Sequence, residues 1–398
     1  ENRRHAREGR AVPDPFKTGA SSPLGTSPFK PGAGKVPPAF GGRDEPLLTA
    51  KAMVDRLAVP SDPVAMPLLR GVCGVGKTAL MAYVRHHAVR VGAVALHIEA
   101  DPSDTDLVAT CQALSRDAAP LASAGRDLAR RLSSLSIAKA EVAFHPPGER
   151  AEANLEALIH DLVLLADAAG RGLMLTVDEV HEAEDLLLRP LVRAIHRHAQ
   201  DSRPFGVMLS GLPGAADRLL TEGQTYTERL TSHDLGMLDL LGVAEALREP
   251  FVDDAGVDVD EEVIDHVHAD SGGYPYFVQL WGEALWDVLP ARRGVRLADT
   301  VRAQRAVDVR RDDFFGRRWR RFPTGRARAL ARELARQGGT ARMSDLARGL
   351  GYASQRVLSD PRATLIAGGH LYSPAYGRVA FTVPGFDSWL LAQPDDDA

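Results

Sequence analysis

A glycine-rich segment in the first quarter of the chain has the residue types and spacing of a phosphate-binding loop. Residues 71–78 have the sequence GVCGVGKT, which fits G-x-x-x-x-G-K-[ST] at every fixed position. Glycines let the backbone curl so that successive N–H groups point at phosphate oxygens, and the first N–H groups of the following helix add to them. The lysine reaches the β- and γ-phosphates, and the threonine hydroxyl binds magnesium. The segment therefore predicts a site for ATP and Mg²⁺ formed by Gly71, Gly74, Val75, Gly76, Lys77, Thr78 and Ala79.

Two acidic residues follow an apolar run much later in the chain. Residues 173–177, LMLTV, have the character of a buried strand, and Asp178 and Glu179 come directly after it. A carboxylate at the C-terminal end of a parallel strand lies at the crevice where α/β sheets bind ligands. We expect Asp178 to hold Mg²⁺ together with Thr78, and Glu179 to orient and deprotonate the attacking water.

A further apolar run, residues 205–209, ends in Ser210 and Gly211. A strand that ends in a small polar residue could place Ser210 against the γ-phosphate or the attacking water, which makes it a catalytic candidate. The alternative is a strand that ends in an ordinary Ser-Gly turn, and the residues leave both open.

The elements around these residues predict an α/β fold with a parallel sheet and helices on both faces. Apolar strands at residues 66–70, 93–98, 173–177 and 205–209 alternate with helical patterns. The strand signal stops near residue 239, and three helical patterns predict a helical lid. From residue 324 the order is helix, helix, helix and hairpin, as in a winged helix-turn-helix.

The predicted domains follow from these patterns. Residues 1–38, rich in Pro, Gly, Ser and Arg, are expected to form a disordered tail because they offer little surface to bury. The remaining segments are expected to be an ATPase core at 39–237 with an insertion at 101–150, a lid at 238–300, an Arg-rich linker at 301–323 and a winged helix at 324–398.

The order of phosphate loop, acid-terminated strand, Ser210, helical lid and winged helix resembles AAA+ ATPases, and within them the origin-recognition-like, archaeal-ATPase-like and STAND groups. The resemblance implies that residues 40–43, ending in Arg43, lie over the adenine. It places Ser210 at the sensor-1 position and implies that Pro275, in the segment GGYP at 272–275, approaches the nucleotide from the lid. It also implies an arginine from a neighbouring subunit, for which Arg229 is the first candidate and Arg218 the second.

The chain also departs from the AAA+ pattern. The lid contains no clear sensor-2 arginine, and the spacing between Lys77 and Asp178 exceeds that of a minimal core. These departures from the AAA+ pattern favour slow hydrolysis.

A stretch rich in arginine indicates what kind of partner the protein binds. Residues 302–336 contain twelve arginines against four acids, and they adjoin the winged helix, whose third helix carries Arg356 and Arg362. Such a stretch can neutralise the phosphates of double-stranded DNA, or its arginines can form ion pairs within the chain.

The favoured function is an ATPase that hydrolyses ATP to ADP and couples nucleotide state to a DNA-associated winged helix. The alternative is a STAND-like switch whose winged helix binds protein, and a homo-oligomer or a partner protein fits either.

Composition limits the remaining classes. Two cysteines, Cys73 and Cys111, in 398 residues form no disulfide framework, which favours a reducing compartment. No apolar run approaches the length of a membrane span, and the first residues lack the apolar centre of a signal peptide. We therefore expect a cytoplasmic location without membrane contact.

Overall fold

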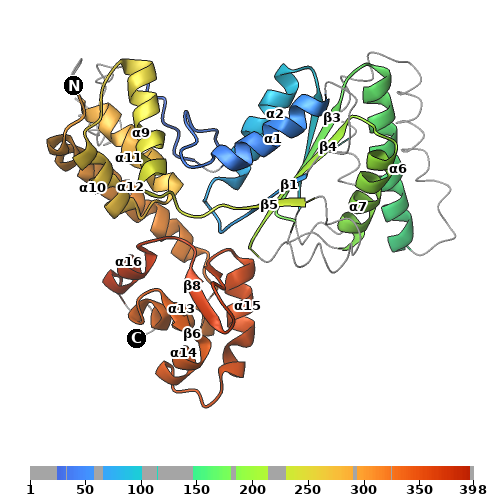
Figure 1. The fold of residues 1–398 in the computed structure, drawn as a ribbon. Helices are drawn as coiled ribbons and strands as arrows, with labels where there is room; N and C mark the ends of the chain where they lie inside the picture. The colour runs from blue at the N-terminus through green and yellow to red at the C-terminus, as the bar shows by residue number, and fades with distance from the viewer. Residues whose placement is uncertain are drawn as a thin grey trace, which may run out of the picture.

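The computed structural model describes residues 25–32, 34–57, 66–100, 114, 147–180, 185–213, 230–289, 294–323 and 325–394. The α/β fold expected from the sequence is confirmed: a five-stranded parallel sheet lies between helices, and further helices follow it (Figure 1). Among the described residues, no helix is both long enough and apolar enough to cross a bilayer.

The sheet has the order β2-β3-β4-β1-β5, and all neighbouring strands are parallel. Its strands are β1 (Met66–Arg70), β2 (Val94–Glu99), β3 (Leu173–Asp178), β4 (Phe205–Gly211) and β5 (Leu230–Asp234). Only β5 has no counterpart among the strands expected from the sequence. Its sequence, LTSHD, is polar because it is an edge strand with only one residue fully buried.

Helices cover both faces of the sheet and bury alternate residues of each strand. Helices α1 (Asp44–Leu57) and α2 (Lys77–Arg90) pack on one face, and α6 (Pro147–Ala168) and α7 (Asp185–Gln200) pack on the other (Figure 1). Leu68 belongs to the hydrophobic cluster on the α6/α7 face, whereas its neighbour Leu69 belongs to the cluster on the α1/α2 face. The continuous apolar strands are therefore explained by burial on both sides.

Four helices form the lid that follows the sheet: α9 (Leu240–Ala255), α10 (Glu261–Ser271), α11 (Pro275–Val288) and α12 (Leu297–Arg320). The C-terminal unit contains α13 (Arg326–Arg336), β6 (Thr340–Arg342), α14 (Met343–Gly349), η2 (Gln355–Leu358), α15 (Ser359–Ala367), β7 (Leu371–Tyr372), β8 (Arg378–Phe381) and α16 (Phe386–Ala392). Its three strands form an antiparallel sheet in the order β6-β8-β7.

The lid and the C-terminal unit share one hydrophobic core. Phe315 and Trp319 of α12 lie in the same buried cluster as Phe386 of α16 and Phe277 of α11. Residues 301–320, expected to form a linker, are therefore part of helix α12, because its inward-facing aromatic side chains are buried between the two units.

The described residues of 25–41, which we call the strap, cross from the lid to the α/β core. Phe29 is only 2% exposed and packs against Phe251 and Trp286 of the lid. The expected disordered tail thus does not extend through residues 25–38, although composition alone favoured it. A single aromatic residue among prolines and glycines anchors the segment.

Candidate functional site

The loop between β1 and α2 has the shape that its sequence predicts. Gly74 and Gly76 have φ angles of 84° and 99°, a left-handed conformation that suits glycine. Gly76 caps helix α2 without a side-chain hydrogen bond, so the first N–H groups of the helix face the loop. Lys77, 4% exposed, donates hydrogen bonds from Nζ to the carbonyls of Gly71 (2.9 Å) and Val72 (3.2 Å). The loop therefore presents N–H donors and a buried cation to an anionic ligand.

Strands β1, β3 and β4 are neighbours in the sheet, and they bring the end of the loop and the acidic pair together. Thr78 Oγ1 donates to Asp178 Oδ2 at 2.6 Å, and the backbone N–H of Glu179 donates to Asp178 Oδ1 at 2.9 Å. The hydroxyl of Ser210 donates to the same Oδ1 atom. A hydroxyl and a carboxylate form the oxygen donor set that Mg²⁺ prefers, so these residues fit the metal.

Ser210 lies behind Asp178 and does not line the cavity. It is fully buried, and its hydrogen bond holds the carboxylate toward Thr78. Its place in the structure is that of a positioning residue.

Glu179 has an unusual backbone. Its φ angle is 52°, the left-handed conformation that costs a non-glycine residue on the order of 1–2 kcal/mol. Unlike Asp178, Glu179 lines the cavity above the phosphate loop.

A cavity of about 880 Å³ lies over the phosphate loop, within the size range of ligand sites. Its walls come from four parts of the chain: the α/β core with its phosphate loop, the strap, the lid and the C-terminal unit. Cationic side chains from three of these parts line it, namely Lys77, Arg43, Lys30, Lys35, Arg317, Arg318 and Arg321. Among the described residues that line the cavity, Glu179 is the only acid. The cavity thus favours a polyanionic ligand.

The lid reaches the phosphate loop through the turn before α11. Tyr274 Oη donates to the carbonyl of Cys73 at 3.3 Å, and burial raises the pKa of its hydroxyl. A Cβ atom on Gly74 would lie 1.8 Å from Tyr274 Oη, so only glycine allows this contact. Pro275 begins α11 and lines the cavity.

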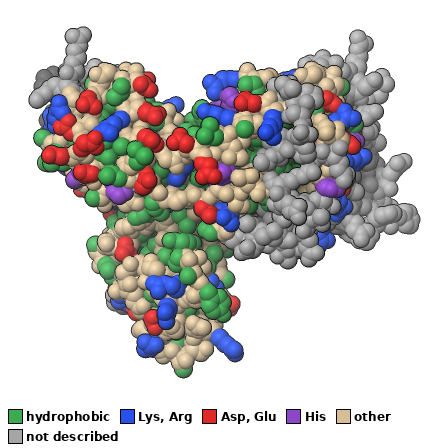
Figure 2. Space-filling model, viewed as in Figure 1, with side chains coloured by type: hydrophobic (Ala, Val, Ile, Leu, Met, Phe, Trp, Pro, Cys, Tyr) green, Lys and Arg blue, Asp and Glu red, His purple; other side chains and the backbone are tan. Residues whose placement is uncertain are grey.

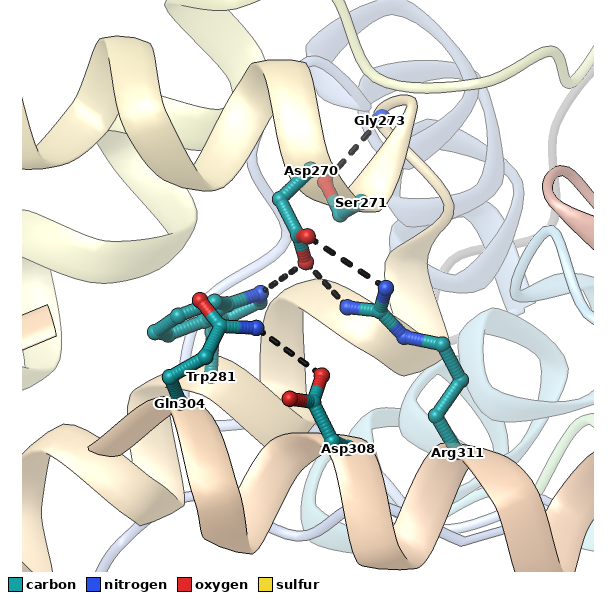
Figure 3. A network of polar contacts seen from close by, with 7 residues as sticks. All are labelled: Asp270, Ser271, Gly273, Trp281, Gln304, Asp308 and Arg311. Atoms are coloured by element: carbon teal, nitrogen blue, oxygen red, sulfur yellow. Dashed lines mark hydrogen bonds and ion pairs between the residues drawn. The ribbon is translucent and has the colours of Figure 1, made fainter. Parts of the chain in front are cut away.

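A polar network inside the lid positions this turn (Figure 3). Asp270 accepts hydrogen bonds from Trp281 Nε1 (2.7 Å) and from the guanidinium of Arg311, which joins α10, α11 and α12. Ser271 Oγ accepts the N–H of Gly273 at 3.1 Å (Figure 3). Gly273 in turn lies against the backbone of Leu238, where a Cβ would be 2.0 Å from the carbonyl oxygen.

The C-terminal unit also contacts the loop. Arg318 of α12 donates to the carbonyl of Gly369 and to the hydroxyl of Thr382. A Cβ on Gly369 would lie 2.7 Å from Cys73 Sγ, so the unit rests directly on the phosphate loop. Burial lowers the pKa of Arg318, and burial, with Arg318 and Arg321 nearby, lowers the pKa of His370 to about 4. His370 is therefore neutral at pH 7.

Arg43, which was expected over the adenine, forms hydrogen bonds with backbone carbonyl groups. Its Nη2 atom donates to the carbonyls of Gly236 (2.5 Å) and Val75 (3.4 Å). Burial lowers its pKa to about 10, and Asp239 opposes that shift. Arg43 thereby ties the phosphate loop to the segment that leads into the lid. Phe40 packs edge-on against Tyr83 of α2 at 5.2 Å and also lines the cavity.

Several expected residues fall outside the described parts of the chain. These are Arg229, Arg218 and residues 101–146 apart from Leu114. The sequence analysis missed Tyr274, Arg318, His370, Lys30 and Lys35 as cavity residues. The sequence signal nearest to this set was the basic stretch 302–336, which contains Arg318.

Most arginines of that basic stretch have partners within the chain. Ion pairs link Arg310 to Glu283, Arg311 to Asp270 and Arg317 to Asp313. Further partners are Asp299 for Arg302, Glu333 for Arg336 and the carbonyl of Pro394 for Arg332. The guanidinium groups of Arg328 and Arg332 lie over the ring of Trp319. Much of this stretch thus makes contacts within the chain, and DNA binding by residues 302–336 stays a prediction.

Comparisons with known proteins give two kinds of similarity. Residues 312–390 match a family described as a domain of unknown function, DUF8462. No curated protein matches the chain. Similar solved structures include the RuvB Holliday junction branch migration motor of Thermotoga maritima, with 15% identity, a TM-score of 0.46 and coverage of 89% of this chain and 97% of that one.

Two further solved structures have similar identities, TM-scores and coverages. The Orc1 protein of Aeropyrum pernix, solved in complex with DNA, shows 16% identity, a TM-score of 0.45 and coverage of 89% and 93%. Cdc6p of Pyrobaculum aerophilum shows 12% identity, a TM-score of 0.43 and coverage of 91% and 95%. These proteins are AAA+ P-loop ATPases, the class that the sequence resembles. At such identities and TM-scores the similarity assigns neither substrate nor partner.

Proposed function

We propose that this protein is a magnesium-dependent P-loop ATPase that binds ATP in the cavity over residues 71–78. One observation supports this above all: Lys77, Thr78 and Glu179 line a cavity rich in cations at the end of a glycine loop, and Asp178 is hydrogen-bonded to Thr78. A triphosphate is the anion that uses all of these groups at once.

The chain's own residues suggest how hydrolysis proceeds. Lys77 would exchange its two carbonyl partners for oxygens of the β- and γ-phosphates. Thr78 and Asp178 would hold Mg²⁺, which supplies positive charge to the phosphates. Ser210 fixes the Asp178 carboxylate, and Glu179 is placed to accept a proton from the attacking water. Arg229 is a candidate for a contribution from a neighbouring copy.

We also propose that nucleotide state controls how the C-terminal unit rests on the phosphate loop. His370 of the C-terminal unit lines the cavity, as does Arg318 of α12, which donates to the carbonyl of Gly369. Gly369 in turn lies against Cys73. A ligand shifts such an equilibrium only if it binds the two arrangements unequally. Because the cavity wall includes both the loop and the C-terminal unit, a γ-phosphate meets that condition. This supports the switch alternative with slow hydrolysis.

The order of helices and strands in residues 326–392 supports a winged helix. Whether this unit binds DNA or protein distinguishes the DNA-associated ATPase from the switch. The strongly acidic face visible in Figure 2 belongs to the lid, where Asp253, Asp254, Glu261 and Glu262 are exposed. Exposed basic side chains of the C-terminal unit include Arg342 and Arg356, and Tyr376 is fully exposed at the tip between β7 and β8. In the DNA-associated function, this surface would contact the duplex.

Steady-state ATP hydrolysis with magnesium, with and without duplex DNA, tests the proposal. Lys77→Ala should lose ATP binding, whereas Glu179→Gln should keep binding and lose turnover. Stimulation by DNA that fades with added salt would favour the DNA-associated function. Turnover unchanged by DNA would favour a switch with a protein partner. A wild-type protein that binds no ATP would refute the proposal.

A further inference from the structure

The strap carries two of the six lysines in the chain, Lys30 and Lys35, and both line the cavity. Nothing in the phosphate-loop chemistry above uses them. Their position depends on how the strap is held, which the described contacts define at both ends.

The lid holds the first end. Phe29 lies against Phe251 at 5.2 Å between ring centroids, and the indole of Trp286 donates to the carbonyl of Gly25 at 3.2 Å. The N–H of Lys30 donates to Gln279 Oε1 at 3.3 Å. A Cβ atom on Gly282 of α11 would lie 2.3 Å from the Phe29 ring, so the helix leaves room for this side chain.

The ATPase core and the start of the lid hold the other end. Phe40 packs on Tyr83 of α2, and a Cβ on Gly41 would lie 1.9 Å from the carbonyl oxygen of Gly242. The strap therefore has fixed ends on both sides of the cavity, and its middle must pass over the phosphate loop.

The middle of the strap lies next to the predicted magnesium ligand. A Cβ on Gly34 would be 3.4 Å from Thr78 Cγ2, and the φ angle of Gly34 is 67°. The N–H of Lys35 closes a turn with the carbonyl of Gly32 at 3.4 Å. Lys35 thus follows directly after the glycine that lies beside Thr78, and the exposed Lys35 lines the cavity.

We propose that Lys35 contacts the terminal phosphates of the bound nucleotide and supplies, from the same chain, a cation opposite Lys77. Thr78 marks the end of the cavity where the β- and γ-phosphates bind, and this assignment rests on the proposed function. An ammonium on a flexible four-carbon stem can reach such a group without moving the backbone. Lys30 is the weaker candidate because its backbone is bonded to Gln279, at the lid end of the strap.

The test measures the affinity of the full chain for ATP, ADP and AMP by calorimetry in a Glu179→Gln background, which prevents turnover. Lys35→Ala should weaken ATP binding about tenfold or more, the usual loss for a charge-assisted contact, and AMP binding less than twofold. Lys35→Arg should recover most of the loss. Lys51→Ala is the matched control, because Lys51 lies over the Tyr83 ring and does not line the cavity.

Two results would overturn the inference. One is an ATP affinity of Lys35→Ala equal to that of Lys51→Ala. The other is an equal loss for AMP and ATP, which would place the contact away from the terminal phosphates. Failure of the proposed function looks different: the parent protein itself would then bind no ATP, and Lys77→Ala would change nothing.

Discussion

Asp178 is the residue through which most of the site is organised. Its two carboxylate oxygens receive the hydroxyls of Thr78 and Ser210 and the N–H of Glu179. A carboxylate with three donors keeps one orientation, so the oxygen that faces Thr78 is preset for a cation. Rigidity at this residue should therefore matter more for turnover than for nucleotide binding.

Replacing Ser210 tests this expectation. Ser210→Ala removes one donor to Asp178 and leaves the phosphate loop untouched, so turnover should fall about tenfold. ATP affinity measured without magnesium should change less than twofold. Ser232→Ala, at an exposed position on β5, is the control and should match the parent. Equal turnover in the two variants would rule out a positioning role for Ser210.

The strained backbone at Glu179 predicts a conflict between stability and activity. Asn accepts the left-handed conformation more readily than Gln, so Glu179→Asn should be more stable than Glu179→Gln by roughly 0.5–1 kcal/mol. Both amides should lack turnover. Urea unfolding of the two variants, which differ by one methylene, measures the difference. If Glu179→Gln is the more stable of the two, the conformation is not strained.

Among the elements, the turn between α10 and α11 is sensitive to added volume. Gly273→Ala would require a φ of 69° and bring Cβ to 2.0 Å from the Leu238 carbonyl, so we expect a loss of at least about 2 kcal/mol in unfolding free energy and weaker ATP binding. Gly256→Ala is matched: its φ is 63°, but the added Cβ meets open space, so it should lose only about 1 kcal/mol and bind ATP normally. Equal behaviour would show that the contact with Leu238 does not position the lid.

The helices, strands and loops also show which features of the structure can be predicted from the sequence. The phosphate loop and the acid-terminated strand depend on local patterns, and both lie where expected. The edge strand β5 and the continuous helix α12 depend on neighbours far along the chain, so local patterns do not reveal them. Arg318 and Arg43 were visible as arginines, but only the fold shows that both line the cavity and donate to backbone carbonyls.

For the whole molecule, two buried histidines predict acid sensitivity. Burial, with His160 beside it, lowers the pKa of His198 to about 4, as burial does for His370. The unfolded chain takes up a proton on each near pH 6.5, whereas the folded chain does not, so stability is present above pH 6.5 and is lost as the pH falls toward 4.

Between pH 7 and pH 5 each histidine should remove up to about 2 kcal/mol of unfolding free energy. Urea titrations at pH 7, 6 and 5 measure the loss, and His370→Gln should reduce it by about half. A stability that is unchanged from pH 7 to pH 5, or a variant with the full loss, would contradict these assignments.

The strap also sets an order of events during synthesis. Its anchors, Phe251 and Trp286, come more than 200 residues after Phe29, and they follow the last core strand, which ends at Asp234. At 5–20 residues per second, a ribosome needs roughly 3–10 s to pass from β5 to Trp286. During that interval all five strands have been made, yet the strap has no lid against which to pack. The emerging chain therefore carries its phosphate loop uncovered until the lid has been translated.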